Sequence, residues 1–182
     1  ASPARVTALG LIDSAGLGRA IHPAMIMSVT PVYADLVFTW CKTPPGALQR
    51  AWARAPLLFA HPERVPPAWY SEQYRLAQLP FFLDAVLASL RAQIDLTGQR
   101  EVVLDQLAGL TMPTMIIWGE DDLVFPVTQA KEAARCLQDG QLRLIPACGH
   151  LPHVEQPAQC ADALDAFLKE VLSYNRREDN GS

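Results

Sequence analysis

Long apolar runs are missing from this sequence of 182 residues. No window approaches the roughly 18 uncharged apolar residues of a membrane span, so the sequence predicts no transmembrane helix and no membrane partner. The N-terminus also lacks the charged, apolar and cleavage regions of a signal peptide. Half of the residues are hydrophobic and 19% are charged, which is typical of a globular domain with a sizeable core. We therefore expect a soluble, cytoplasmic protein.

An excess of positive charge is missing as well. The formal net charge is −4 and the isoelectric point is about 5.5, with Lys and Arg dispersed along the chain. Such a surface offers no basic field, so we expect no nucleic-acid partner. The four cysteines include no C-x-x-C pair. This spacing favours free thiols in a reducing compartment over a disulfide framework.

The first strand pattern is short, and a long region without any strand pattern follows it. Val6–Asp13 (VTALGLID) is an apolar run before the glycine-rich S-A-G-L-G, and it predicts a buried parallel strand within a core segment of residues 1–20. Residues 21–107 hold most of the 15 prolines and show helical spacing, which predicts a helical insertion. The candidate helices are Ala24–Cys41, Gly46–Arg54, Ala68–Gln78 and Pro80–Ile94.

Strand and helix patterns alternate in residues 108–174, and the polar residues 175–182 are predicted to be disordered. The expected elements are strands at Thr114–Trp118 and Gln141–Ile145 and helices at Thr128–Leu137 and Ala158–Tyr174. This alternation through short loops predicts an α/β fold, with a parallel sheet flanked by helices. Three strands do not complete a doubly wound sheet for a chain of this size, so we expect further strands to come from elsewhere.

Polar side chains follow two of the expected strands. Glu120, Asp121 and Asp122 come directly after the first, in W-G-E-D-D-L-V-F-P, and His150 follows the next, in P-A-C-G-H-L-P-H-V-E-Q-P. Carboxyl ends of parallel strands meet at one edge of a sheet, where the active sites of such sheets collect. The two loops therefore predict a carboxylate beside a histidine, which fixes the tautomer of the ring and stabilises its imidazolium form.

These two segments resemble the last two strands of the α/β-hydrolase superfamily. The family's G-x-x-D pattern makes Asp122 the catalytic acid, with Asp121 as the alternative, and its G-H pattern makes His150 the general base. The opening P-A-R-V-T-A-L-G-L-I-D-S-A-G is similar to the strand before the family's lid, so residues 21–107 fall where the lid is inserted. The resemblance implies a partial α/β-hydrolase fold that hydrolyses an ester or similar acyl substrate, with no cofactor and no metal.

The nucleophile elbow of that family, G-x-S-x-G, does not occur in the 182 residues. In the family the elbow precedes the strand that opens this sequence, so we expect the chain to be the C-terminal part of a longer enzyme. Its partners would be a small, moderately apolar substrate and the missing N-terminal segment, or a swapped second copy. Ser14 is a poor nucleophile candidate, because Ile12 stands where the strained turn needs a small residue. Asp13 stays open as an alternative acid or a helper.

Other interpretations also stay open. An aspartate at the elbow would indicate a haloalkane dehalogenase or an epoxide hydrolase, and a serine also fits a hydrolase of carbon–carbon bonds. Alone, the chain would be a catalytically incomplete binding or structural module. A zinc site is not expected from Cys148, His150, His153 and Glu155, because their spacing lacks the paired cysteines of structural zinc sites. Aromatic residues of the expected lid line an apolar pocket or form its core: Trp40, Trp52, Phe59, Trp69, Tyr70, Tyr74, Phe81 and Phe82.

Overall fold

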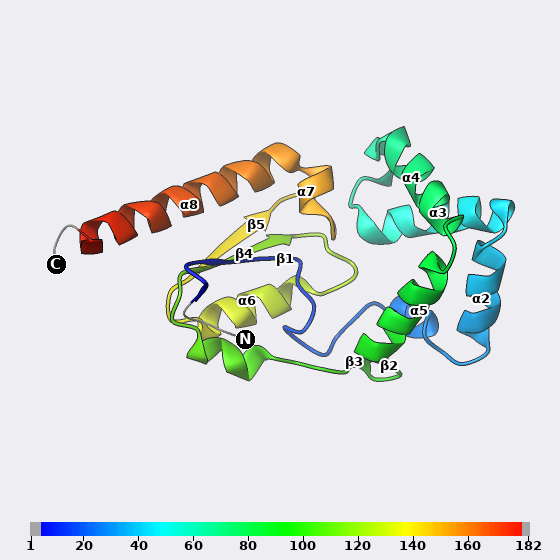
Figure 1. Ribbon diagram of the computed structural model, residues 1–182, viewed down its shortest axis with the longest axis horizontal. Helices are drawn as coiled ribbons and strands as arrows, with labels where there is room; N and C mark the ends of the chain where they lie inside the picture. The colour runs from blue at the N-terminus through cyan, green and yellow to red at the C-terminus, as the bar shows by residue number, and fades with distance from the viewer. Residues whose placement is uncertain (1–4, 180–182) are drawn as a thin grey trace.

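A three-stranded parallel sheet forms the centre of the protein (Figure 1). The computed structural model describes residues 5–179. The strands are β1 (Leu9–Ile12), β4 (Thr114–Gly119) and β5 (Gly140–Ile145), in the order β1-β4-β5. The first residue of each strand pairs with the first residue of the next, so the strands end at the same edge of the sheet. Every residue of the middle strand β4 is buried. The predicted parallel sheet is thereby confirmed.

Alternate residues of β4 point to opposite faces of the sheet, and a different helix covers each face. Ile116 and Trp118 belong to a core cluster with α6 (Val127–Cys136). Met115 and Ile117 belong to a second cluster with α8 (Pro157–Asp179). Figure 1 shows α8 above the sheet and α6 below it. A short 3-10 helix, η3 (Leu104–Gly109), leads into β4 on the α6 side.

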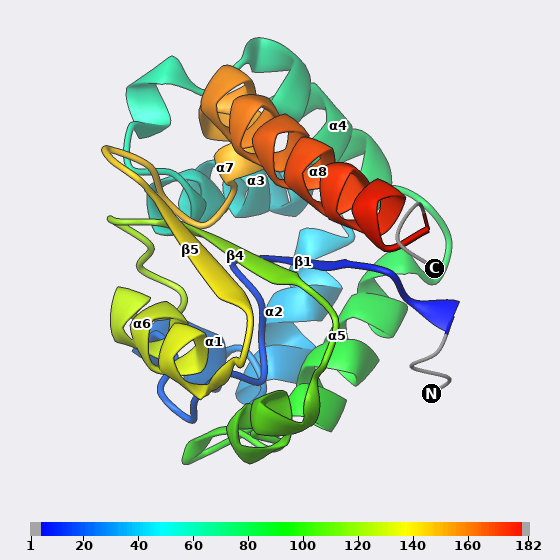
Figure 2. The same ribbon diagram turned by 90° about the vertical axis from the view of Figure 1, so that its left-hand side faces the viewer.

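Between β1 and β4 the chain forms a group of helices, here called the helical segment (residues 23–93). It consists of α1 (Pro23–Met27), α2 (Tyr33–Cys41), α3 (Pro44–Leu58), η2 (Pro62–Arg64), α4 (Pro67–Ala77) and α5 (Phe82–Gln93). The segment lies beside the carboxyl ends of the strands (Figures 1 and 2). Most of it packs around its own small core, while Leu58 and Phe59 at the end of α3 join the core under the sheet. The end of α3 is therefore a junction between the two parts.

The expected helical insertion, residues 21–107, differs from the prediction in two places. Ala24–Cys41 is not one helix but two, because the chain leaves the helix after Met27 and re-enters it at Tyr33. Pro31 lies in this break, where its missing N–H and its ring disfavour a continuous helix. No strand was expected within residues 21–107, yet β2 (Ile94–Asp95) and β3 (Gly98–Gln99) form a small antiparallel hairpin. Strands of two residues are too short for an alternating pattern to reveal them.

The last helix is longer than predicted. α8 continues through Asp179, into the polar stretch that was expected to be disordered. Arg and Glu in this stretch are good helix formers, so its polar composition alone did not indicate disorder. The remaining predictions for residues 1–4 and 180–182 lie outside the described residues. Although α8 has 23 residues, no helix in the described part of the chain is both long and apolar enough to cross a membrane.

Candidate active site

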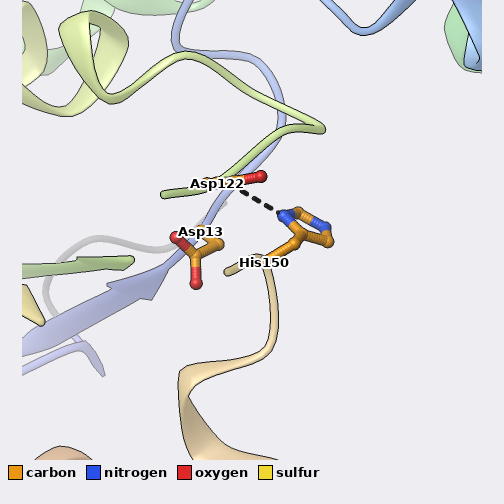
Figure 3. A group of neighbouring side chains, drawn as sticks. All are labelled: Asp13, Asp122 and His150. Atoms are coloured by element: carbon orange, nitrogen blue, oxygen red, sulfur yellow. Dashed lines mark hydrogen bonds and ion pairs between the residues drawn. The ribbon is translucent and has the colours of Figure 1, made fainter. Parts of the chain in front are cut away.

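The three strands end side by side, and the loops that follow them bring three ionisable residues together (Figure 3). Asp13 comes directly after β1, Asp122 lies in the loop after β4, and His150 lies in the loop after β5. One ligand-type atom from each lies within 4.8 Å of the others. The parallel topology therefore places residues that are far apart in the sequence at a single point.

A glycine is required where β4 runs into its loop. A Cβ atom at Gly119 would collide with the carbonyl oxygens of Cys148 and Gly149 in the loop after β5. The two loops are also joined by a hydrogen bond of 3.0 Å from the Asp121 amide to the Cys148 carbonyl. The close approach of these backbones explains the first residue of the G-x-x-D pattern and fixes the distance between the acid loop and the histidine loop.

Asp122 and His150 form a hydrogen-bonded pair. The Nδ1 atom of His150 lies 3.0 Å from Oδ2 of Asp122, the contact drawn as a dashed line in Figure 3. The other carboxylate oxygen accepts hydrogen bonds from the amides of Val124 (2.7 Å) and Phe125 (3.1 Å). The Asp122 side chain is fully buried and the His150 side chain is 18% exposed. A carboxylate held in this way favours the tautomer in which the proton is on Nδ1 of the ring, and this leaves Nε2 as the basic nitrogen.

The backbone around His150 is tied to the helical segment. The His150 amide donates to the carbonyl of Leu58 at 2.9 Å. The Glu155 carboxylate accepts from the amides of Gly149 (2.7 Å), Ala60 (3.2 Å) and His61 (2.8 Å). One carboxylate thus joins the histidine loop to the residues that follow α3. In the sequence, Glu155 stood out only as a possible metal ligand, because partners some 95 positions away leave no local pattern.

Asp13 is the third carboxyl group at this edge, and its surroundings are different. Its Oδ1 accepts from the amide of Gly119 at 3.0 Å, but its Oδ2 is buried without a hydrogen-bond partner. The pKa of Asp13 is raised to about 7, chiefly by burial and in part by the nearby Asp122, against the opposing effects of the Gly119 amide and His150. The residue also has a positive φ of 39°. Asp13 can therefore hold a proton near neutral pH beside the Asp122–His150 pair.

The other residues that the sequence offered as site candidates do not join the Asp122–His150 pair. Asp121 and Glu120 are exposed, so Asp122 is the acidic residue of this loop that reaches His150. No hydrogen bond joins Ser14 to His150 among the described residues. His153 is exposed, and burial raises the pKa of Cys148 to about 12, which keeps its thiol neutral. In the described part of the chain, the grouping with metal-ligand geometry is Asp13, Asp122 and His150.

The aromatic residues of the helical segment divide between core and surface. Phe59 is buried, and Trp69 packs edge-on against it at a centroid distance of 5.1 Å. Trp52 is exposed and stacks on Tyr70 at 4.4 Å, whereas Phe81 is 81% exposed. A cavity of about 270 Å³ lies at the junction with the histidine loop, and its lining includes Phe59, His61 and Glu155. Of these aromatics, Phe59 belongs to the core and also lines this cavity.

The family model described as the alpha/beta hydrolase family matches residues 7–163 of this chain. An uncharacterized protein of Mycobacterium tuberculosis is 37% identical over 82 residues, which are 44% of this chain and 24% of that protein. A monoacylglycerol lipase of Bos taurus is 38% identical over 64 residues, 35% of this chain and 19% of the lipase.

Two solved structures show the likeness in three dimensions. A thermophilic esterase from Thermogutta terrifontis has a TM-score of 0.66 and 24% identity, covering 93% of this chain and 58% of the esterase. A 2-hydroxy-6-oxo-6-phenylhexa-2,4-dienoate hydrolase from Rhodococcus has a TM-score of 0.70 and 18% identity, covering 94% of this chain and 57% of the hydrolase. At these identities the likeness shows the fold. The chain spans little more than half the length of these two structures and matches a quarter or less of the two sequence relatives.

Proposed function

The chain belongs to the alpha/beta hydrolase family, and we propose that it supplies the catalytic acid, Asp122, and the general base, His150, for hydrolysis of an ester or similar acyl substrate. The observation that carries the proposal is the 3.0 Å contact between Oδ2 of Asp122 and Nδ1 of His150. The second oxygen of Asp122 already accepts hydrogen bonds from two amides, so the carboxylate has one fixed direction in which to accept a hydrogen bond from the ring N–H. No cofactor takes part.

In the proposed reaction, Nε2 of His150 removes the proton of a serine hydroxyl as the serine oxygen attacks the acyl carbon. Asp122 stabilises the imidazolium that forms, and the ring then gives its proton to the leaving alcohol. Water, activated by the same nitrogen, releases the acid and restores the serine. The serine elbow does not occur in the 182 residues. The proposal therefore includes a nucleophile from an N-terminal segment of the same protein or from a swapped copy.

We further propose that the helical segment acts as the lid of the active site. Two observations support this role: the segment lies beside the carboxyl ends of the strands, and it contacts the histidine loop through Leu58 and Glu155. The 270 Å³ cavity at this junction is lined by apolar residues such as Phe59 and Val154 and by polar residues such as Arg64 and Glu155. We propose that it takes a small, moderately apolar substrate.

The test uses the full-length protein that contains this chain. We expect a fluorophosphonate probe to label a single serine and a short-chain nitrophenyl ester to be hydrolysed, with both reactions lost in His150→Ala. His153→Ala, an exposed neighbour, is the matched control and should retain activity. Full activity in His150→Ala would contradict the proposal. Trapping of an alkyl-enzyme ester on an aspartate would instead identify a dehalogenase or epoxide hydrolase, and turnover of vinylogous diketones alone would identify a carbon–carbon bond hydrolase.

A further inference from the structure

The positive charges of the helical segment fall into two groups. Four of its cations lie towards the surface, and each forms an ion pair with a carboxylate of the same segment. These pairs are Lys42–Asp84, Arg64–Glu63, Arg75–Glu72 and Arg91–Asp35. These four pairs contain every Asp and Glu of the helical segment, residues 23–93. Arg50 and Arg54 form no ion pair with any described residue, and they leave two positive charges of the segment unbalanced.

The two unpaired arginines lie together between α3 and α4. They are one helical turn apart on α3, and both donate to the same atom, Oε1 of Gln73 on α4. The Nη1 atom of Arg50 lies 3.5 Å from this oxygen, and Nη1 of Arg54 also contacts it. A neutral amide oxygen cannot balance two cations, and each guanidinium has five N–H donors.

Among residues 5–179, no negatively charged group compensates the charge of this pair. Burial and, to a smaller extent, the nearby Arg50 lower the pKa of Arg54 to about 10. Burial also lowers the pKa of Arg50, and the one ionisable group acting in the opposite direction is the Cys41 thiol. Burial raises the pKa of that thiol, so it is neutral at physiological pH. Both guanidinium groups therefore remain charged and half-buried, an arrangement that is costly without a counter-ion.

We propose that Arg50, Arg54 and Gln73 form a binding site for a small oxyanion, a carboxylate or a phosphate, between α3 and α4. Guanidinium groups bind such anions through paired N–H donors in a planar fork. Both arginines are partly exposed, so an anion can reach them from solvent. One turn beyond Arg54, the carbonyl of Leu58 accepts from the His150 amide, so the site lies on the helix that contacts the candidate active site. The anion is either free in solution or the acidic group of a substrate.

Calorimetric titration of the full-length protein with inorganic phosphate at constant ionic strength tests the site directly. We expect saturable binding in the parent protein, and binding weaker by about tenfold or more in Arg54→Met, which keeps the apolar stem but loses the charged donors. Arg75→Met is the matched control: it removes a surface arginine of α4 that already has a carboxylate partner, and phosphate binding should not change. Equal phosphate affinity in the parent and Arg54→Met, or no saturable binding in the parent, would overturn the proposal.

A second variant keeps the test informative if Arg54→Met does not fold. Gln73→Glu places a carboxylate at the atom on which both arginines converge, and it preserves the shape of the side chain. We expect this internal counter-ion to raise the melting temperature in phosphate-free buffer and to abolish phosphate binding. Unchanged phosphate binding together with a lower melting temperature would show that phosphate does not bind at these two arginines, and would overturn the proposal.

Kinetic measurements distinguish a free anion from the acidic group of a substrate. This part of the test rests on the proposed hydrolysis. If the site takes the acidic group of a substrate, phosphate competes with an ester that carries a free carboxylate, and Arg54→Met raises KM for that ester but not for a neutral one. If the site takes a free anion, phosphate affects both esters alike. The calorimetric result does not depend on turnover, so a failure of the proposed hydrolysis is distinguishable from a failure of the anion site.

Discussion

The ends of β1 and β4 carry two aspartates that are almost equally buried, at 5% exposure for Asp13 and 7% for Asp122. Their hydrogen bonding is not equal. Both oxygens of Asp122 have partners, two amides on one and the His150 ring on the other. Asp13 has one amide partner, and its second oxygen has none. Two carboxyl groups of similar burial therefore differ in the number of donors around their oxygens, and the one with an unpartnered oxygen, Asp13, has its pKa raised to about 7.

The largest effect we expect comes from Asp122→Asn, which changes the aspartate that has hydrogen-bond partners on both oxygens. A neutral amide stabilises the imidazolium poorly and does not hold the same tautomer, so kcat/KM for ester hydrolysis should fall by about three to four orders of magnitude. Steady-state kinetics of the full-length protein measure this loss. The exposed neighbour provides the control, since Asp121→Asn should stay within a few-fold of the parent. A small loss in Asp122→Asn and a large one in Asp13→Asn would transfer the acid role to Asp13.

Asp13→Asn should act mainly on the pH dependence of stability. The folded pKa of Asp13, about 7, is above its ordinary value of 3.8. Between these values the unfolded chain releases the proton while the folded protein keeps it, so this carboxyl destabilises the fold increasingly from about pH 4 to pH 7 and constantly above. The asparagine variant lacks this penalty, so relative to the parent it should gain about 1–3 kcal/mol between pH 4 and pH 8.

Urea unfolding of both proteins at several pH values measures this gain. The same difference between the two proteins at pH 4 and pH 8 would show that Asp13 titrates normally.

The smallest effect we expect concerns Glu155, a third carboxylate near the site, which differs from both aspartates because it binds backbone amides of two separate regions. Glu155→Gln keeps the shape but removes the charge and one acceptor oxygen, so one or two of three amides lose their partner. We expect a loss of about 1–2 kcal/mol in unfolding free energy and a several-fold rise in KM. Glu120→Gln, at an exposed site, should change neither quantity. If stability falls but KM does not, the carboxylate does not couple the helical segment to the histidine loop.

Much of the fold could be predicted because its periodic signals are strong. The apolar runs at Leu9–Ile12 and Thr114–Gly119 and the helical spacing of α6 and α8 arise from burial between layers, which acts on every residue of an element. The failures involve short or boundary features. The β2–β3 hairpin is too short to show a period, and the end of α8 consists of polar residues that form a helix as readily as a coil.

The candidate site was only partly visible in the sequence. The G-x-x-D and G-H patterns identified Asp122 and His150 because the geometry of each loop depends on nearby residues, as the close approach at Gly119 shows. The catalytic roles of the two residues stay predictions. The contact between Glu155 and the residues after α3, and the convergence of Arg50 and Arg54 on Gln73, have no sequence pattern, because their partners lie on other elements.

By itself, the sequence determined the α/β class, the order of the elements after residue 108, and the two loops that hold an acid and a histidine. These properties follow from local periodicity and from motifs within a few residues. Tertiary structure alone decided which acid lies at 3.0 Å from the histidine ring, which buried oxygen lacks a partner, and which two arginines lack a carboxylate. The physical reason is that hydrogen bonding and charge compensation depend on atoms within a few ångströms, and the fold brings those atoms together from positions far apart in the chain.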